Sequence, residues 1–188
     1  MSTTLQEEQV LTDLRNLVFT GSDSLGVPLS ELQLSDCMEY LLLLQKWNKT
    51  YNLTAIRDIR QMAIQHMLDS LAVIPFLPLD EPGTRLLDVG SGAGLPGIPI
   101  AVARPEIQVT LLDSNQKKAA FMLHAAGSLR LEQTRVVTAR VETWKADKPF
   151  DVIISRAYSD LATFVGQTGH LLAEQGILAA MKGQYPAK

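Results

Sequence analysis

Apolar residues recur at helical spacing along the first 75 positions of the chain. Residues three and four apart lie on one face of a helix, so this spacing predicts helices that each bury one face. The second and third of these helices are expected over Leu34–Lys49 and Ile59–Phe76. Ser35 suits the N-cap of the second helix, because its hydroxyl can accept a hydrogen bond from a free backbone N–H of the first turn. A proline-rich segment from Pro75 to Gly83 ends this helical region.

Beyond that segment, apolar runs of strand length alternate with helical stretches. The expected strands are Arg85–Val89, Gln108–Asp113, Arg135–Ala139, Asp151–Ser155 and Ile177–Met181, and the expected helices are Pro96–Ala103, Gln116–Gly127 and Leu161–Leu172. Continuous apolar strands separated by helices imply a parallel sheet covered by helices on both faces. The pattern therefore predicts a doubly wound, Rossmann-like α/β fold over residues 79–188. Residues 1–78 are expected to form a helical extension packed on it, in one compact unit.

The composition is that of a globular protein with a hydrophobic core. Of the 188 residues, 46% are hydrophobic, and no apolar run approaches the roughly 20 residues needed to span a bilayer. The first residues show no basic segment followed by an apolar one, so we expect a cytoplasmic, monomeric protein without a membrane partner. Cys37 is the single cysteine and the three histidines are scattered, which argues against a disulfide and a bound metal.

Charge is unevenly distributed along the chain, although the net charge is only −3. Residues 1–40 carry one basic and seven acidic side chains, a balance of −6, whereas residues 41–188 carry 16 basic and 13 acidic side chains, a balance of +3. This small surplus would attract phosphates only weakly. A nucleic-acid partner would therefore have to be recognised by its shape or within a preassembled particle.

The segment from Leu86 to Gly97 combines an apolar strand, glycines at alternate positions and the start of a helix. Glycine adopts positive φ angles and lets a ligand approach the backbone, and a helix start offers free N–H groups. The segment therefore predicts a site for a nucleotide-like molecule. Hydrolysis of a nucleoside triphosphate is disfavoured, because the phosphate-binding loop would require lysine in place of Ile98.

Two acidic residues narrow the choice of ligand. Asp88 lies two positions before Gly90, where its charge is expected to point at the ligand, repel a diphosphate and attract a cation. Asp113 ends the next strand, where a carboxylate can accept hydrogen bonds from both ribose hydroxyls. S-adenosylmethionine, an adenosine joined to a cationic group, fits this pair. A nicotinamide dinucleotide is the alternative, which would make the chain an NAD-dependent oxidoreductase.

Five segments of the chain resemble one known family. They are Trp47–Thr54, His66–Ser70, Leu87–Pro99, Leu111–Ser114 with Lys117 and Lys118, and Ile154–Ala157. They are similar to the bacterial small-subunit rRNA guanine-N7 methyltransferases, also called the glucose-inhibited division protein B family. Many methyltransferases share the glycine motif, whereas the first and last segments are far more specific. The resemblance extends from about residue 35 to Gly183.

The resemblance implies a class I methyltransferase that moves a methyl group from S-adenosylmethionine to N7 of one guanine in 16S rRNA, either free or in the small ribosomal subunit. Carried over position by position, it places cofactor contacts at Gly90, Leu95, Val141 with Glu142, and Arg156. Together with the residues that the glycine and acid pattern indicates, the expected cofactor site comprises Asp88, Gly90, Gly92, Leu95, Asp113, Val141, Glu142 and Arg156.

Arg156 follows the fourth expected strand and would face the space between methyl donor and acceptor, where it positions the reactants. The alternative is a surface arginine paired with Asp160. No general base is expected, because guanine N7 already carries a lone pair. Enzymes that methylate exocyclic amines commonly carry a [DNS]-P-P-[YFW] segment where this chain has Ser155-Arg156-Ala157-Tyr158. Cys37 is expected to be a packed side chain rather than a nucleophile.

Basic residues around the glycine segment are candidates for contact with RNA phosphates. They are Lys46, Lys49, Lys117, Lys118 and Lys182. Trp47 and Tyr51 could stack on an unpaired base, but their spacing of four also fits a helix face that packs on the domain.

The chain departs from the family pattern at two places. Gln65 stands where the family usually has a basic residue, which weakens the case for a phosphate contact there. The chain ends at Lys188, shortly after the fifth expected strand, whereas class I methyltransferase sheets normally have seven strands. We therefore expect the C-terminal edge hairpin to be missing. A non-catalytic, ribosome-associated module that binds S-adenosylmethionine is a further alternative.

Overall fold

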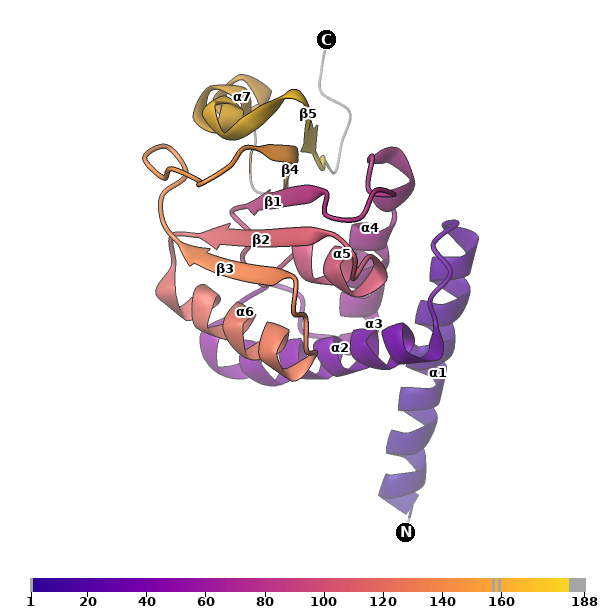
Figure 1. The fold of residues 1–188 in the computed structure, drawn as a ribbon. Coiled ribbons are helices and arrows are strands. Elements are labelled where there is room, and N and C mark those ends of the chain that lie inside the picture. The colour runs from indigo at the N-terminus through magenta and orange to yellow at the C-terminus, as the bar shows by residue number, and fades with distance from the viewer. Residues whose placement is uncertain (1, 157, 159, 183–188) are drawn as a thin grey trace.

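The computed structural model describes residues 2–156, 158 and 160–182, which form one five-stranded sheet flanked by helices (Figure 1). The strands are β1 (Arg85–Val89), β2 (Gln108–Asp113), β3 (Thr134–Thr138), β4 (Phe150–Ser155) and β5 (Leu172–Ala180). They run parallel in the order β3-β2-β1-β4-β5. The strand order reverses at β1, so the carboxyl ends of the central strands form the crevice where such sheets bind ligands. The predicted fold class is confirmed.

The predicted strands agree closely at the centre of the sheet and less well at its edge. β1 and β2 have the predicted bounds, whereas β3 and β4 each begin one residue early. β5 begins five residues before the predicted start, because Leu172 already pairs with Phe150 across an irregularity in the register. Residues 172–176 are partly or fully exposed, so they lack the apolar run that marks a buried strand. The expected lack of an edge hairpin concerns sequence outside the described residues.

Two helices begin the chain, α1 (Ser2–Ser24) and α2 (Glu31–Tyr51). The prediction that Ser35 caps the second helix is wrong, because Ser30 is the N-cap. Ser30 Oγ accepts a hydrogen bond from Gln33 N at 3.2 Å, and the Gln33 side chain accepts one from Ser30 N at 2.9 Å. This reciprocal capping box satisfies two backbone N–H groups, so the helix begins three residues earlier than its apolar spacing suggested.

The third predicted helix is present in pieces. They are α3 (Ile59–Met62), the π-helical turn η1 (Ala63–Leu68), α4 (Asp69–Leu71) and the 3-10 turn η2 (Ile74–Phe76). A π-helical turn holds more residues than an α-helical turn and is often found at functional sites. His66 lies in this π-helical turn and lines a cavity beside the glycine-rich loop. The apolar spacing of the sequence does not predict this position of His66.

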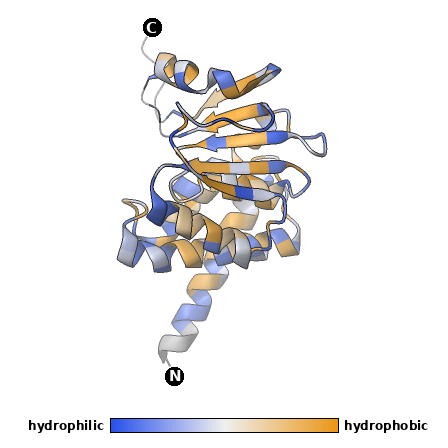
Figure 2. Cartoon of the chain, turned by 60° about the vertical axis from the view of Figure 1, so that its left-hand side comes forward, coloured by the Kyte–Doolittle hydropathy of each residue, from blue (hydrophilic) through white to orange (hydrophobic). Residues whose placement is uncertain are grey.

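Helices cover the two faces of the sheet unequally (Figure 1). On one face lie α5 (Gly97–Ala103), α6 (Gln116–Ser128) and the N-terminal helices, and on the other lie α7 (Leu161–Thr168) and the 3-10 turn η3 (Gly169–Leu171). Alternate strand residues face the two layers: Leu86 and Leu111 belong to the first cluster of buried side chains, Leu87 and Leu112 to the second. Figure 2 shows the resulting apolar band through the strands.

The N-terminal helices contribute to the same hydrophobic core as the sheet. Tyr40 of α2 is fully buried, and its hydroxyl donates to Ala93 O at 2.8 Å in the glycine-rich segment. The ring of Trp47 lies 5.6 Å from that of Phe121 in α6. Cys37 is buried, and burial raises its pKa to about 12, so it is a packed thiol as expected. None of the described helices is long and apolar enough to cross a membrane.

Candidate functional site

The glycine-rich loop after β1 is held against the end of β2. Gly90, Gly92 and Gly94 have φ angles of 68°, 61° and 80°, a region that side chains other than glycine rarely adopt. The N–H groups of Gly90 and Ser91 both donate to Leu112 O, at 2.8 and 3.1 Å. The loop is therefore a fixed backbone surface beyond the carboxyl ends of the central strands.

Asp88 lies beneath this loop, and the prediction that its charge points at a ligand is wrong. Its side chain is fully buried, and its Oδ2 accepts hydrogen bonds from Ser91 Oγ at 2.6 Å and Gly97 N at 2.8 Å. Burial raises its pKa to about 6, although these two hydrogen bonds act in the opposite direction. Asp88 thus holds the loop from below. Its Oδ1 is buried without a hydrogen-bond partner among the described residues.

Asp113, at the end of β2, borders a cavity of about 370 Å³. One carboxylate oxygen accepts a hydrogen bond from Gly92 N at 2.9 Å and the other from Asn115 N at 2.8 Å. A carboxylate offers about four lone-pair positions, so both oxygens can accept a further donor from the cavity. Val141 and Glu142, where the family resemblance implied cofactor contacts, line the same space.

A second cavity, of about 190 Å³, shares Gly90 with the first. Its walls include the backbone of the glycine loop and the side chains of Leu95, Thr54, His66 and Arg156. Because Gly90 has no side chain and borders both spaces, one elongated ligand can occupy the two cavities by passing over it.

Arg156 follows β4 and reaches the helical segment that precedes β1. Its Nη1 lies 3.4 Å from Asp69 Oδ2, and its Nη2 lies 3.2 Å from Nδ1 of His66. The alternative pairing with Asp160 is wrong, because Asp160 caps α7 by accepting hydrogen bonds from Thr163 N and Oγ1 at 2.7 and 2.6 Å. Ala157, the next residue of this family segment, lies outside the described residues.

His66 is the residue of this site that sequence reasoning did not identify. It is 6% exposed, and its Nε2 lies 2.7 Å from Thr54 Oγ1. Burial and the Arg156 charge lower its pKa, whereas Gln65 O and Asp69 act in the opposite direction, so the ring is neutral at pH 7. The available signal was a histidine within an apolar helical stretch, since a buried imidazole requires hydrogen-bond partners.

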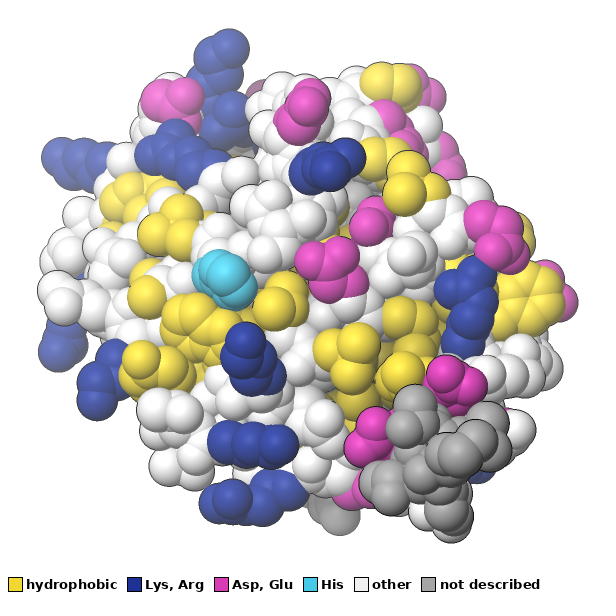
Figure 3. Space-filling view, turned by 90° about the horizontal axis from the view of Figure 1, so that it is seen from below, with side chains coloured by type: hydrophobic (Ala, Val, Ile, Leu, Met, Phe, Trp, Pro, Cys, Tyr) yellow, Lys and Arg dark blue, Asp and Glu magenta, His cyan; other side chains and the backbone are white. Residues whose placement is uncertain are grey.

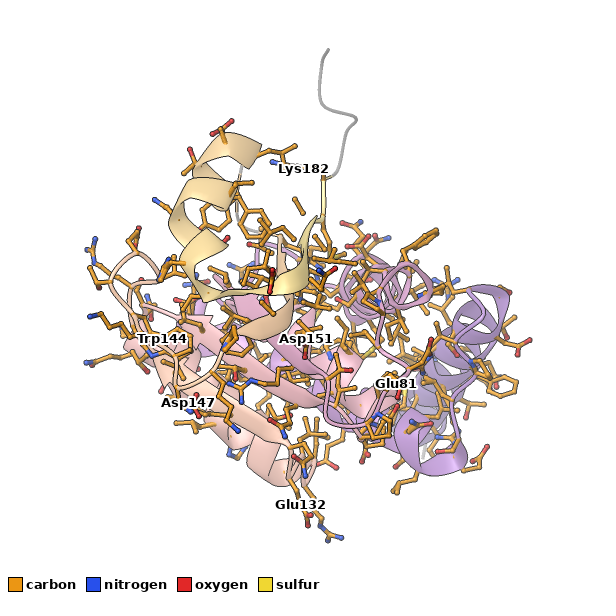
Figure 4. All side chains as sticks on the ribbon, turned by 45° about the horizontal axis from the view of Figure 1, so that its top comes forward. Glu81, Glu132, Trp144, Asp147, Asp151 and Lys182 are labelled. Atoms are coloured by element: carbon orange, nitrogen blue, oxygen red, sulfur yellow. The ribbon has the colours of Figure 1, made fainter. Side chains whose placement is uncertain are left out.

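The five lysines predicted to contact RNA lie in two separate places. Lys46 and Lys49 are exposed near the end of α2, and Lys117 and Lys118 stand in the first turn of α6. Lys182 follows β5 (Figure 4), and its Nζ donates to Tyr158 O at 2.5 Å. The structure thus places the first four on adjacent helices and Lys182 beyond the end of β5.

The two rings near the end of α2 have different environments. Trp47 packs against Phe121, and its ring centroid lies 5.3 Å from that of His124. This agrees with the packing interpretation. Tyr51 contacts Trp47 at 5.2 Å but is 44% exposed, so one side of its ring is open to solvent.

The groups along the two cavities fit the parts of S-adenosylmethionine. Asp113 offers carboxylate oxygens to ribose hydroxyls, and Val141 offers an apolar wall to the adenine ring. Arg156 offers a guanidinium to the carboxylate of the methionine part. Asp88 lines neither cavity, so it would act on such a ligand only through the loop that it holds. Among the described residues, no group of three His, Cys, Asp or Glu side chains could hold a metal ion.

Replacing Gly97 by alanine is expected to destabilise the protein by about 2 kcal/mol. The added Cβ would lie 2.2 Å from Leu111 Cδ2 and 2.8 Å from Asp88 Oδ2, both in the buried core. The matched control is Gly127→Ala in α6, where no atom lies within 4 Å, and it should stabilise the protein by up to about 1 kcal/mol. Urea unfolding measures both. Equal stability of Gly97→Ala and wild type would contradict this close packing.

The chain is similar in sequence to one family of methyltransferases. The family model for GidB, described as rRNA small subunit methyltransferase G, matches residues 33–188. A ribosomal RNA small subunit methyltransferase G from Methylobacillus flagellatus is 50% identical over 167 residues, which cover 89% of this chain and 80% of that protein. The protein of the same name from Burkholderia thailandensis is 51% identical over 177 residues, covering 92% and 77% of the two chains.

Solved structures with a similar fold are distant in sequence. A SAM-dependent methyltransferase from Geobacter sulfurreducens, in complex with S-adenosyl-L-homocysteine, gives a TM-score of 0.54 at 18% identity and covers 78% of this chain and 58% of its own. One from Thiobacillus denitrificans, with the same ligand, gives 0.52 at 19% identity, covering 73% and 53%. At these identities the likeness concerns the fold alone.

Proposed function

The chain belongs to the rRNA small subunit methyltransferase G (GidB) family, and from this premise we propose that it methylates N7 of one guanine in 16S rRNA with S-adenosylmethionine as methyl donor. The observation that carries the proposal is the pair of neighbouring cavities that share Gly90 in their walls and are lined in part by residues of the family's characteristic segments. The alternative function, that of an NAD-dependent oxidoreductase, is not favoured.

The cofactor would be held along the glycine loop. Asp113, Val141 and Glu142 would bind adenosine, and Leu95 and Arg156 would bind the methionine part. Gly90 and Gly92 would present bare backbone, and Asp88 would act through the loop that it holds. Bound S-adenosylmethionine supplies an electrophilic methyl group.

Methylation of guanine N7 requires no general base from the protein. Guanine N7 presents an in-plane lone pair to the major-groove edge and carries no proton to remove. The protein has to orient that atom toward the methyl group and exclude water. His66, neutral at pH 7, is not required as a base in this scheme. The lack of a [DNS]-P-P-[YFW] segment at residues 155–158 supports N7 over an exocyclic amine.

Transfer of labelled methyl groups to ribosomal substrates tests the proposal. The purified chain is incubated with labelled S-adenosylmethionine and with either free 16S rRNA or unmethylated small ribosomal subunits. Alkali-labile cleavage then maps any 7-methylguanine. Label on a single guanine N7 is expected. Label on another base atom or on protein would contradict the proposal, and tight cofactor binding without turnover on either substrate would favour the non-catalytic module.

The RNA is proposed to approach over α2 and α6. Residues 40–57 and 114–131 contain no acidic side chain, and the two helices contact each other through Trp47 and Phe121. Figure 3, which views this side from below, shows most of the Lys and Arg side chains toward the left and most of the Asp and Glu side chains toward the right. The left is the side of the carboxyl ends of the strands in Figure 1. Phosphates would therefore meet positive charge next to the cofactor cavities.

Removing Lys46 and Lys49 together is expected to weaken binding to 16S rRNA about 10-fold at 100 mM salt. Each lysine that contacts a phosphate adds about one unit to the slope of log K against log salt, so the slope should fall by about two. Lys145→Ala with Lys148→Ala is the control, because it removes the same charge from exposed positions between β3 and β4. Equal losses in both double variants would argue against this RNA path. Filter binding at several salt concentrations measures the affinity of each variant for 16S rRNA and its dependence on salt.

A further inference from the structure

His66 lies between two polar side chains that reach the second cavity from different elements. Its Nδ1 is 3.2 Å from Nη2 of Arg156, which follows β4, and its Nε2 is 2.7 Å from Oγ1 of Thr54, which follows α2. All three line the cavity. We propose that His66 is a positioning residue, which holds the Arg156 guanidinium for the carboxylate of the cofactor by accepting its hydrogen bond. The inference rests on the proposed function, from which the cofactor is taken.

Nδ1 of His66 lies near a donor, Nη2 of Arg156 at 3.2 Å, and near an acceptor, Gln65 O at 3.1 Å. We infer that the contact with Arg156 sets the tautomer of the imidazole. A guanidinium only donates, so the contact with Arg156 requires a lone pair on Nδ1 and therefore a proton on Nε2. The Nε2–H then donates to Thr54 Oγ1, which also accepts from Ile56 N at 3.2 Å. Both lone pairs of that hydroxyl are then in use, and its proton is available to a group in the cavity.

The opposite tautomer would place two donors against each other. A proton on Nδ1 could be donated to Gln65 O, at 3.1 Å, but it would also face Nη2 of Arg156. A doubly protonated ring would add a second positive charge at the same distance. Both species release the guanidinium from His66 and leave Asp69, at 3.4 Å, as its charged partner.

Acidification is therefore expected to weaken cofactor binding through His66. The charged groups that face the ring are Arg156, from the end of β4, and Asp69, from the next helical turn, and Gln65 contributes its carbonyl. Burial and Arg156 lower the pKa of His66, so the neutral ring persists through pH 7 and protonation begins below the usual histidine range. The same protonation turns Nδ1 from an acceptor into a donor.

Two conservative variants separate the roles of the ring nitrogens. His66→Asn places an amide oxygen near the position of Nδ1, where it can still accept from Arg156. His66→Gln reaches toward Thr54 but leaves no acceptor at the position of Nδ1. Gln nearly matches His in volume, whereas Asn is one methylene group smaller than Gln and leaves the larger cavity. A purely structural role therefore predicts the larger loss for His66→Asn, the opposite order.

The readout is the dissociation constant of S-adenosylmethionine for the purified full chain from pH 5 to 8, with the unfolding temperature as a folding check. At pH 7.5, His66→Asn should bind within about threefold of wild type and His66→Gln about 10-fold more weakly. Below pH 6, His66→Asn should lose less affinity than wild type. Similar affinities of the two variants, whether both equal to wild type or both weakened, would overturn the inference.

Nitrogen chemical shifts of the His66 ring give a test that needs no cofactor. A proton on Nε2 and none on Nδ1 is expected at pH 7, and the Nδ1–H tautomer would overturn the inference. A chain that binds S-adenosylmethionine with the expected His66 dependence, yet methylates no ribosomal substrate, would remove the proposed function alone.

Discussion

Replacing Arg156 by alanine is expected to lower kcat/KM for methylation of small ribosomal subunits about 100-fold. A guanidinium forms two charge-assisted hydrogen bonds with a carboxylate, and their loss costs roughly 2.7 kcal/mol of binding, a factor of about 100. If Arg156 binds the carboxylate of the cofactor, the loss appears mainly in KM for S-adenosylmethionine. Steady-state transfer of labelled methyl groups at varied cofactor concentration measures both constants.

Two further arginine variants control this experiment. Arg156→Lys keeps the charge but not the planar pair of donors, so it should recover only part of the activity. Arg104→Ala removes an arginine at the end of α5, where its Nη1 donates to Ala103 O, and should leave kcat/KM unchanged. If the Arg156→Ala variant keeps the wild-type kcat/KM, Arg156 does not bind the cofactor. A loss confined to kcat would instead place it nearer the acceptor.

Asp88→Asn is expected to gain about 2.4 kcal/mol of stability relative to wild type as the pH rises from 4 to 7. Burial raises the pKa of Asp88 from 3.8 to about 6 in the folded protein. Between these values the unfolded chain binds fewer protons at Asp88 than the folded one, so the contribution of Asp88 to stability falls as the pH rises. Asparagine does not titrate, and the variant therefore lacks this decline. Urea unfolding at pH 4, 5, 6 and 7 measures the difference.

Ser91→Ala supplies the companion variant for Asp88. Ser91 Oγ donates to Asp88 Oδ2 at 2.6 Å and favours the charged carboxylate, so its removal raises the pKa of Asp88 further. The decline in stability should then extend to higher pH than in wild type. If wild type and Asp88→Asn show parallel stability curves across this range, Asp88 does not titrate as its burial requires.

The strands and turns around the cofactor cavities could be predicted because their causes are local. β1 and β2 are apolar runs bounded by polar or glycine residues, and they have the predicted bounds. Glycines at alternate positions indicate positive φ angles, which Gly90 and Gly92 adopt. The edge strand β5 was predicted only in part, because its first half is exposed and its pairing depends on β4.

The direction of the buried polar side chains could not be predicted in the same way. Asp88 was expected to face a ligand, but Ser91 Oγ and Gly97 N offer it hydrogen bonds inside the fold. The side chain of an acidic residue at a strand end points toward the hydrogen-bond donors around it. For Asp88 these donors come from the loop that follows the strand. Asp113, by contrast, borders the cavity at the predicted strand end, with its hydrogen bonds to backbone N–H groups.

The sequence by itself determined the parallel sheet, the glycine loop and the acids at the strand ends, because hydrophobic periodicity and backbone preference act between near neighbours. Only the tertiary structure decided which side chains surround Arg156. His66 and Asp69 lie 90 and 87 positions from it in the chain, and they meet it because the π-helical turn packs beside the end of β4. Contacts over such separations depend on how helices and strands pack against each other, which no local pattern encodes.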